Sequence, residues 1–230
     1  MILKALYRLI RGLTSPKRQI KKLYLNSLFN KVNGVIHVGG NYGQESKFYN
    51  GKNLNVLWIE PIPEIFEQLN LNIQKYHNQK AINALITDKD DKEYVFNIAN
   101  NKGGSSSIFK LKDHSELWPE VDYVKSINIK STKLSSLVKH HNIDMSKYQF
   151  LVLDTQGSEM LVLNSAIPIL KYFKYIKLEV ANFEAYQGCC TLEDVYAFMK
   201  KNNYTEVGKY QFAGKKSKKY FDIVFKKIDE

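Results

Sequence analysis

The sequence predicts an α/β fold in which helices cover both faces of a mostly parallel sheet. Apolar runs of strand length alternate along the chain with segments of helical periodicity, which is typical of βαβ units. Several of these runs are uninterrupted, as expected for strands that are covered on both faces. With 230 residues, 44% of them hydrophobic, the chain is long enough to bury one core, so a single α/β domain with appendages is expected.

The predicted elements follow in a regular order. Strands are expected at the apolar runs 35–38, 56–59, 81–86, 94–98, 150–153 and 175–180, and helices at 64–76, 134–140 and 192–202. The run 220–225 lacks room before it for another crossover helix, so we expect it to join the sheet antiparallel. Right-handed crossovers between the other strands place the ligand site beyond their C-terminal ends.

The positive charge is concentrated at the N-terminus. Residues 1–44 contain eight Lys or Arg residues and no Asp or Glu. Residues 45–230 contain 26 basic and 23 acidic residues, so they carry only +3 of the total net charge of +11. Apolar residues at helical spacing predict two short amphipathic helices here, separated near Ser15 and Pro16. We expect a basic segment at 1–31 and one domain at 32–230. Residues 1–30 either contact an anionic membrane surface, or cover a sheet edge or another subunit.

Composition narrows the class of protein. The body has no continuous basic stripe, which argues against nucleic-acid binding. Cys189 and Cys190 are adjacent and have neither disulfide nor zinc spacing, and no acidic or histidine cluster has the spacing of metal ligands, so no metal is expected. Charges interrupt every apolar stretch of membrane-spanning length. We expect a cytoplasmic protein, with contact at the inner face of the membrane as the alternative; the oligomeric state is not indicated.

A glycine-rich turn follows the first predicted strand, in the stretch HVGGNYGQE that begins at His37. Its glycines allow a ligand to approach the backbone, and the following helix offers free N–H groups. A dinucleotide fingerprint ending at Gly43 would need glycine at position 38, which is valine. The turn therefore suits a ligand without phosphates, unless it is only a tight turn that binds nothing.

The second predicted strand ends in an acid, Glu60, followed by Pro61. A carboxylate about twenty residues beyond such a glycine turn binds ribose hydroxyls in nucleotide-binding α/β folds. Adenosine recognition without pyrophosphate recognition favours S-adenosylmethionine over a dinucleotide. The alternative is that Glu60 only precedes a proline turn.

Further acids end two later strands. The stretch LDTQGSE places Asp154 at a strand end and Glu159 in the next helical turn, although Asp154 as a helix cap and Glu159 as a complement to the helix dipole would explain the spacing too. Glu179 closes the following strand, where a buried charge is costly unless it is bonded.

Five ordered blocks make the chain similar to the FkbM family of methyltransferases from about residue 35 to residue 225. They are HVGGNYGQES, WIEPIPEIFEQLNLNI, GGSSSIF, LDTQGSEMLVL and KLEVANFEAYQG. The resemblance implies a Rossmann-like class I methyltransferase fold at 32–230, a mostly parallel seven-stranded sheet with an antiparallel last strand plus N-terminal helices, and S-adenosylmethionine as cofactor. The cofactor-binding residues that it implies are His37, Gly39, Gly40, Asn41, Tyr42, Gly43, Glu60, Pro61, Asp154, Gln156 and Gly157.

The resemblance also implies roles on the acceptor side. Methyl transfer to oxygen needs a base for the hydroxyl proton, and we favour Asp154 and Glu159 over His114 and Glu184 because the surroundings of His114 are not defined by the sequence and a lone histidine there is expected to be exposed. The residues assigned to substrate binding are Ser105, Ser106, Ser107, Glu179 and Tyr186. The loop 100–107 is expected to be mobile, either closing over the substrate or lying on the surface.

One departure from the family pattern affects the cofactor site. His37 stands where many members have Asp, and a neutral imidazole does not supply the charge that would meet the cofactor's amino nitrogen. The resemblance implies O-methylation of a sugar hydroxyl in a surface polysaccharide or another glycosylated product. An RNA methyltransferase and a non-catalytic cofactor-binding module are the alternatives.

Overall fold

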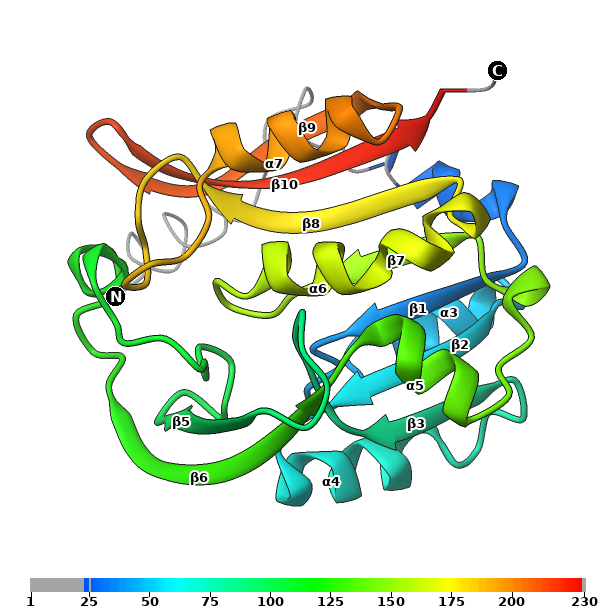
Figure 1. Ribbon diagram of the computed structural model, residues 1–230, viewed down its shortest axis with the longest axis horizontal. Coiled ribbons are helices and arrows are strands. Elements are labelled where there is room, and N and C mark those ends of the chain that lie inside the picture. Colours follow the sequence, from blue (N-terminus) through cyan, green and yellow to red (C-terminus); the bar gives the residue numbers. More distant parts are fainter. Residues whose placement is uncertain (1–22, 25, 229–230) are drawn as a thin grey trace, which may run out of the picture.

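The computed structural model describes residues 23–228 apart from residue 25, and its main feature is a seven-stranded sheet of order β3-β2-β1-β7-β8-β10-β9 (Figure 1). Strands β1, β2, β3, β7 and β8 pair parallel, whereas β10 is antiparallel to both of its neighbours. This confirms the predicted fold class. The strands are β1 (Gly34–Val38), β2 (Asn55–Glu60), β3 (Gln79–Asn83), β7 (Phe150–Leu153), β8 (Tyr175–Ala181), β9 (Tyr204–Lys215) and β10 (Lys218–Lys227).

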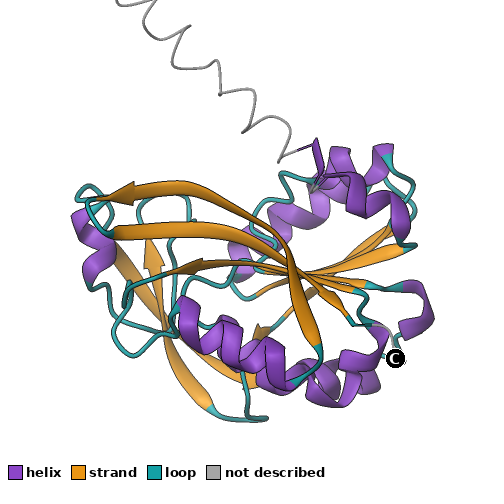
Figure 2. Ribbon diagram, turned by 90° about the horizontal axis from the view of Figure 1, so that it is seen from above, coloured by secondary structure: helices purple, strands orange, loops and turns teal. Residues whose placement is uncertain are grey.

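Helices cover both faces of this sheet, as Figure 2 shows. Val35 and its neighbours on one face pack against α3 (Ser46–Gly51) and α4 (Pro63–Ile73), while Ile36 and its neighbours on the other face pack against α5 (Leu134–His140), α6 (Glu159–Ala166) and α7 (Leu192–Lys201). All five residues of β1 are buried, which explains its uninterrupted apolar sequence. The predicted helices are confirmed within a few residues at each end. The 3₁₀ turns are η1 (Phe29–Lys31), η2 (Asp113–Glu116), η3 (Met145–Lys147) and η4 (Ile167–Tyr172).

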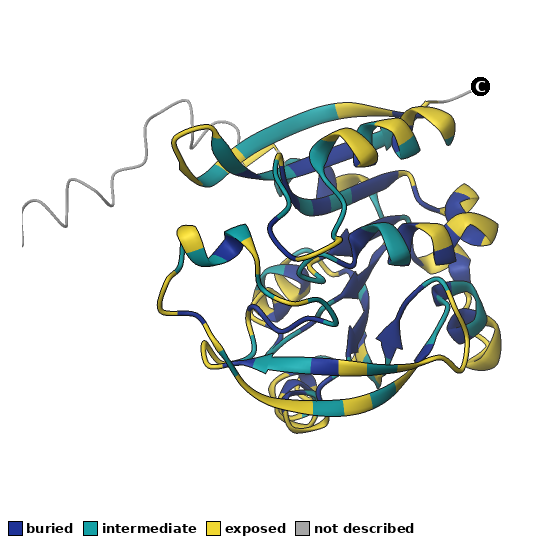
Figure 3. Ribbon diagram, turned by 60° about the vertical axis from the view of Figure 1, so that its left-hand side comes forward, coloured by how far each residue is buried: buried dark blue, intermediate teal, exposed yellow. Residues whose placement is uncertain are grey.

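A second, three-stranded sheet of order β4-β6-β5 was not predicted. It consists of β4 (Leu85–Ile86), β5 (Glu93–Ala99) and β6 (Tyr123–Thr132), with β5 and β6 antiparallel. The run 81–86 is therefore two strands in two sheets, and the run 94–98 is not a strand of the main sheet. We missed β6 because lysines and other polar residues alternate with its apolar ones, and Figure 3 shows that much of it is exposed. The strand β9 was missed for the same reason.

The N-terminal segment is described only at its end. The first predicted helix and most of the second lie outside the described residues, but residues 23, 24 and 26–28 are helical. Leu28 and Phe29 are buried, and the Phe29 ring stacks on Phe150 with 4.2 Å between centroids. The last residues before the predicted boundary at residue 31 thus pack against the sheet.

Candidate active site

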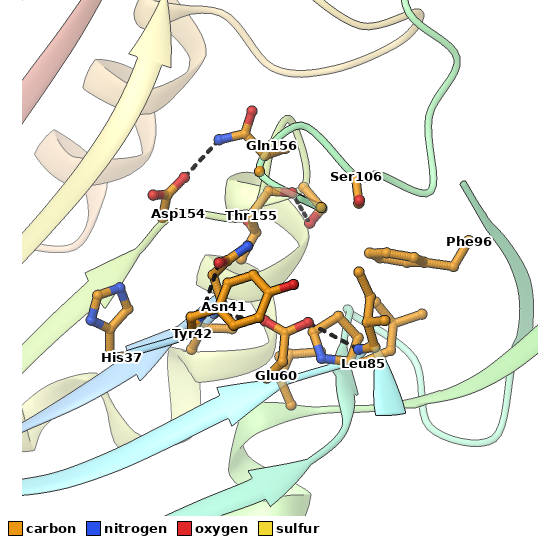
Figure 4. A pocket seen from close by; sticks show the side chains of 18 of the residues that line it. His37, Asn41, Tyr42, Glu60, Leu85, Phe96, Ser106, Asp154, Thr155 and Gln156 are labelled. Carbon is orange, nitrogen blue, oxygen red and sulfur yellow. Dashed lines mark hydrogen bonds between the residues drawn. The ribbon is translucent and has the colours of Figure 1, made fainter. Parts of the chain in front are cut away.

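A cavity of about 360 Å³ opens at the C-terminal ends of β1, β2 and β7, as predicted for a sheet of this class (Figure 4). Segments far apart in the sequence line it together, namely the glycine turn after β1, the end of β2, strand β4, the 101–106 loop and the turn after β7. The side chains are not evenly distributed. His37 and Asp154 lie at one end, Phe96 and Leu85 lie at the other, and Glu60 lies between them.

The glycine turn brings two strand ends into contact. Gly39 has φ +84°, and a Cβ atom on it would lie 1.9 Å from the backbone oxygen of Asp154. The N–H groups of Gly39 and Gly40 both donate to the Ile59 carbonyl, at 2.9 and 3.0 Å. Gly39, Asn41 and Tyr42 line the cavity, whereas Gly40 and Gly43 pack against Leu69 and do not. The two latter glycines therefore shape the turn rather than contact a ligand.

Glu60 is tied to both neighbouring loops. Its Oε2 accepts a hydrogen bond from Asn41 N at 2.8 Å, and its Oε1 accepts one from Ile62 N at 2.9 Å. Burial raises the pKa of Glu60 to about 7, although these two N–H groups oppose the shift. Each carboxylate oxygen can still accept a second hydrogen bond, which suits a pair of ribose hydroxyls beside Pro61 in the cavity wall.

His37 is buried within strand β1. Its Nδ1 lies 3.2 Å from the Tyr49 hydroxyl, and its ring stacks on Trp58 with 4.8 Å between centroids. Burial, together with the positive charge of Lys177, lowers the pKa of His37 to about 3. The imidazole is therefore neutral, so it cannot replace the charge of an aspartate.

Asp154 points into the cavity and is exposed there. The Gln156 amide donates to Asp154 Oδ1 at 2.7 Å, and the Tyr186 hydroxyl donates to Gln156 Oε1 at 2.7 Å. Gln156 has φ +52°, a left-handed conformation that non-glycine residues seldom adopt and that places its side chain in this chain of bonds. Desolvation at the cavity wall raises the pKa of Asp154. Asp154 does not cap α6, whose N-cap residue is Ser158, so the structural alternative for its spacing is wrong.

Glu159 holds the turn after β7 together. Its oxygens accept hydrogen bonds from Thr155 N at 3.0 Å and from Gly157 N at 2.9 Å, and Thr155 Oγ1 adds another. The side chain is only 3% exposed and does not line the main cavity. These contacts favour a positioning role for Glu159 over the catalytic role that we expected.

The three serines of the 100–107 loop anchor this loop. Ser107 Oγ donates to Gln156 O at 2.7 Å, Ser106 Oγ accepts from Ala99 N at 3.0 Å, and Ser105 Oγ contacts His114 Nε2 at 3.2 Å. All three are buried, and only Ser106 lines the main cavity. The loop is therefore tied down by its hydroxyl groups, in contrast to the mobile loop predicted from its composition.

The other two base candidates lie outside the main cavity. His114 is buried rather than exposed, and its second ring nitrogen contacts the Tyr220 hydroxyl at 2.8 Å; burial lowers its pKa to about 4. Glu184 is half-buried and forms an ion pair with Lys112. Neither side chain is placed to receive a proton in the cavity.

A second, much smaller cavity adjoins the first at Gln156. Its volume of about 20 Å³ is enough for one water molecule, and Glu179 and Tyr186 lie in its wall. Burial and the negative charges of Asp154 and Asp222 raise the pKa of Glu179 well above its usual range. The structure thus brings both residues, which we assigned to substrate binding, into the wall of a cavity that Gln156 also lines.

Several lining residues were not singled out from the sequence. Glu45 lies in the first motif block, where its acidic side chain was an available signal, and Phe96 lies in a strand whose sheet we misassigned. Lys177, within the run 175–180, pairs with Asp222 at 2.8 Å across β8 and β10. No sequence pattern indicated that pairing.

The buried acids predict an unusual pH dependence of stability. The pKa values of Glu60 and Glu159 are each raised from 4.5 to about 7 in the folded chain. A carboxyl group whose pKa is higher in the folded chain than in the unfolded chain stabilises the fold at pH values below its unfolded pKa. This stabilisation is lost as the pH rises through the folded pKa. We expect the free energy of unfolding to fall between about pH 5 and about pH 8, by at most roughly 3 kcal/mol per group.

Urea unfolding at several pH values measures this effect. Glu60→Gln removes one titrating group and should make the slope of unfolding free energy against pH less negative, whatever it does to the absolute stability. An unchanged slope in this variant would show that Glu60 does not titrate in that range.

The fold and the cavity together define the class of protein: an α/β domain of the class I methyltransferase type, with a nucleoside-sized pocket at its strand ends. The model of the methyltransferase FkbM domain matches residues 37–206, so the chain belongs to the FkbM methyltransferase family. No curated protein matches the chain. The cofactor of this methyltransferase is S-adenosylmethionine.

Solved structures with the same fold are distant in sequence. The METTL16 methyltransferase domain has a TM-score of 0.55 at 9% identity, covering 92% of this chain and 68% of its own. Magnesium protoporphyrin IX methyltransferase from Synechocystis PCC 6803, with S-adenosylmethionine bound, has a TM-score of 0.50 at 9% identity, with coverage of 92% and 80%. Streptococcus pneumoniae Sp1610, a candidate tRNA (m1A22) methyltransferase, has 0.50 at 10%, with coverage of 91% and 72%. At these identities the likeness concerns the fold.

The residues of the cavity fit the cofactor. Apolar and aromatic side chains at the Phe96 end suit adenine, Glu60 in the middle suits ribose hydroxyls, and the turn at Gly39 leaves no room for a Cβ atom beside Asp154. Within the described part of the chain no His, Cys, Asp or Glu group has metal-binding geometry. No helix in that part is long and apolar enough to cross a membrane.

Proposed function

We propose that this protein transfers a methyl group to a hydroxyl of a sugar, in a surface polysaccharide or another glycosylated product. The observation that carries the proposal is the placement of Asp154 in the wall of the main cavity, where Gln156, which lines both cavities and accepts a hydrogen bond from Tyr186, orients it. S-adenosylmethionine supplies a methyl group on a positively charged sulfur, and its transfer to a hydroxyl releases one proton that the protein must accept.

Asp154 is the proposed base for this proton. Its Oδ1 is engaged by Gln156, which leaves Oδ2 available to the acceptor hydroxyl. Because desolvation raises the pKa of Asp154, its carboxylate binds a proton more strongly near neutral pH than an ordinary aspartate does. We place Glu179 and Tyr186 beside the acceptor, since polar side chains of this kind hydrogen-bond sugar hydroxyls.

RNA is the second candidate acceptor. It is favoured by the eight Lys and Arg residues within positions 1–44 and by the tRNA assignment of Sp1610. We rank RNA lower because the rest of the chain carries a net charge of only +3. In addition, similarity to a structure at such low sequence identity supports a shared fold and not a shared substrate. A non-catalytic module would bind the cofactor without transfer to any acceptor.

The acceptor class is tested by offering methyl-labelled S-adenosylmethionine together with bacterial-type polysaccharides, soluble oligosaccharides or total RNA. We expect label in the carbohydrate fraction, absent when periodate has destroyed the acceptor diols beforehand. Label confined to RNA would replace the sugar proposal with the second candidate. Cofactor binding without transfer to any fraction would favour the non-catalytic module.

Residues 1–30 are proposed to assist this reaction by holding the protein against an anionic surface, since glycan acceptors are often assembled there. Deleting residues 1–22, which keeps the buried Leu28 and Phe29, should weaken sedimentation with phosphatidylglycerol vesicles, with an effect that decreases as salt rises. Equal sedimentation of the two proteins would remove this role.

A further inference from the structure

A carboxylate at one end of the main cavity has no assigned task. Glu45 lines the cavity and occupies the N-cap position of α3, yet its side chain makes no capping hydrogen bond. Apart from its own backbone N–H, it has no hydrogen-bond partner among the described residues. Glu45 is an exposed residue, but partial desolvation at the cavity wall raises its pKa, and the negative charges of Asp154 and Asp222 raise it further. An acid of this kind is stabilised by a cation that enters the cavity.

A buried histidine lines the same end of the cavity. His37 is 5% exposed, its Nδ1 contacts the Tyr49 hydroxyl, and its Nε2 has no hydrogen-bond partner among the described residues. Tyr49 lies one helical turn after Glu45, since its N–H donates to the Glu45 carbonyl at 2.9 Å, and the charges of Glu45 and Asp154, which both line the cavity, raise the pKa of Tyr49. When Nδ1 carries the imidazole proton, Nε2 offers a lone pair to a donor in the cavity.

The charges around this end do not balance within the described chain. Five carboxyl groups influence one another here, and the one lysine among these groups, Lys177, is paired with Asp222 at 2.8 Å. The carboxyl groups are those of Glu45, Asp154, Glu159, Glu179 and Asp222. The opposite end of the cavity is lined by the uncharged side chains of Leu85, Ile86 and Phe96, and Lys102 of the 101–106 loop also lies in the cavity wall. A ligand with a cationic end and an apolar aromatic end would therefore bind in one orientation.

We propose that Glu45 recognises the ammonium group of the methionine part of S-adenosylmethionine, with His37 Nε2 accepting a second hydrogen bond from that group. The carboxylate that β1 lacks at position 37 is thus supplied eight residues later, from the loop that leads into α3. Glu45 positions the cofactor, and Asp154 keeps its free oxygen for the acceptor. The inference concerns the cofactor alone and holds for any acceptor class.

Isothermal titration of Glu45→Gln with three ligands tests this assignment. S-adenosylmethionine and S-adenosylhomocysteine carry the amino-acid part, whereas 5′-methylthioadenosine lacks it. We expect both amino-acid ligands to bind roughly tenfold or more weakly, as for a lost charge-assisted hydrogen bond, and 5′-methylthioadenosine to bind as before. Glu67→Gln, which removes an exposed glutamate of α4 that does not line the cavity, should bind all three normally.

Two further measurements separate recognition from a structural effect. At saturating cofactor, kcat of Glu45→Gln should equal that of the parent protein while KM for S-adenosylmethionine rises. Binding of S-adenosylmethionine should also release protons, because a carboxyl group of raised pKa ionises beside the ammonium group, and Glu45→Gln should release fewer. The other titratable groups to consider are Asp154, Lys177 and Asp222, whose charges act on Glu45, Tyr49, on which Glu45 acts, and His37, which lines the same cavity.

Each contrary result has a distinct meaning. Equal weakening of all three ligands would show that Glu45 acts on the nucleoside or on the fold, and unchanged binding of S-adenosylmethionine would show that Glu45 does not contact the ammonium group. Either result overturns the proposal. Failure of the parent protein to bind any of the three ligands would instead contradict the cofactor assignment itself.

Discussion

Asp154→Asn is expected to lower kcat for methyl transfer by about 10²–10⁴-fold, the usual contribution of a positioned base. Asparagine has nearly the same shape and retains an acceptor for the Gln156 amide, so the turn after β7 should keep its conformation. The affinity for S-adenosylhomocysteine should change little, because the variant retains Glu45 and Glu60. Steady-state kinetics with the labelled acceptor, together with calorimetry, measure both quantities.

The pH profile distinguishes a lost base from a displaced acceptor. In the parent protein kcat/KM should decrease as pH falls through the raised pKa of Asp154, because only the carboxylate accepts the proton. This acidic limb should be absent in Asp154→Asn. The control is Asp91→Asn, an exposed residue with φ +57° that asparagine tolerates, and it should keep the parent kcat.

A different result would move the catalytic role to another residue. If Asp154→Asn retained most of the parent kcat while Glu179→Gln lost it together with the acidic limb, Glu179 would be the base. If neither substitution affected kcat, neither Asp154 nor Glu179 would accept the proton, and the proposed oxygen acceptor would need to be abandoned.

Gly39→Ala is the substitution with the largest expected effect on the fold. The new Cβ atom would lie 1.9 Å from the Asp154 backbone oxygen, at a residue whose φ of +84° alanine adopts only with strain. Backbone strain and overpacking together should cost about 2–5 kcal/mol of unfolding free energy. Because relief requires the turns after β1 and β7 to separate, cofactor binding should be lost as well. Urea unfolding and calorimetry measure the two effects.

Gly51→Ala is the matched control for this substitution. Gly51 ends α3 and has no positive φ, and a Cβ atom on it would meet no neighbouring group within 4 Å. The variant should be as stable as the parent or more stable by up to about 1 kcal/mol, since alanine favours helix. Similar stability of the Gly39 and Gly51 variants would show that the turns after β1 and β7 do not pack against each other closely.

Local hydrophobic patterns in the sequence were sufficient to predict the strands that are buried on both faces. The runs that became β1, β2, β7 and β8 are continuous in apolar residues because helices cover both sides of the sheet, and α5 was predicted over its full range for its clear periodicity. Acids and glycines at strand ends predicted the edge of the sheet that carries the cavity, because parallel strands end on the same side.

Partly exposed strands were not predictable in this way. In β6 and β9 polar and apolar residues alternate imperfectly, and a strand exposed on one face needs few apolar residues. The division of the run 81–86 between two sheets depends on pairing with β2 on one side and with β6 on the other. Such pairings join distant segments, which a local pattern does not report.

The order of residues along the chain was enough to establish a doubly covered parallel sheet, its binding edge and the membership of the FkbM family, because each follows from periodicity or from motifs whose residues are neighbours in sequence. Three-dimensional packing determined the role of each side chain. Glu159 is bonded to its own turn, His114 is buried behind Tyr186, and Glu45 faces the cavity. Burial and hydrogen-bond partners come from segments that meet only in the folded chain, and they decide whether an acid binds a backbone, a proton or a cation.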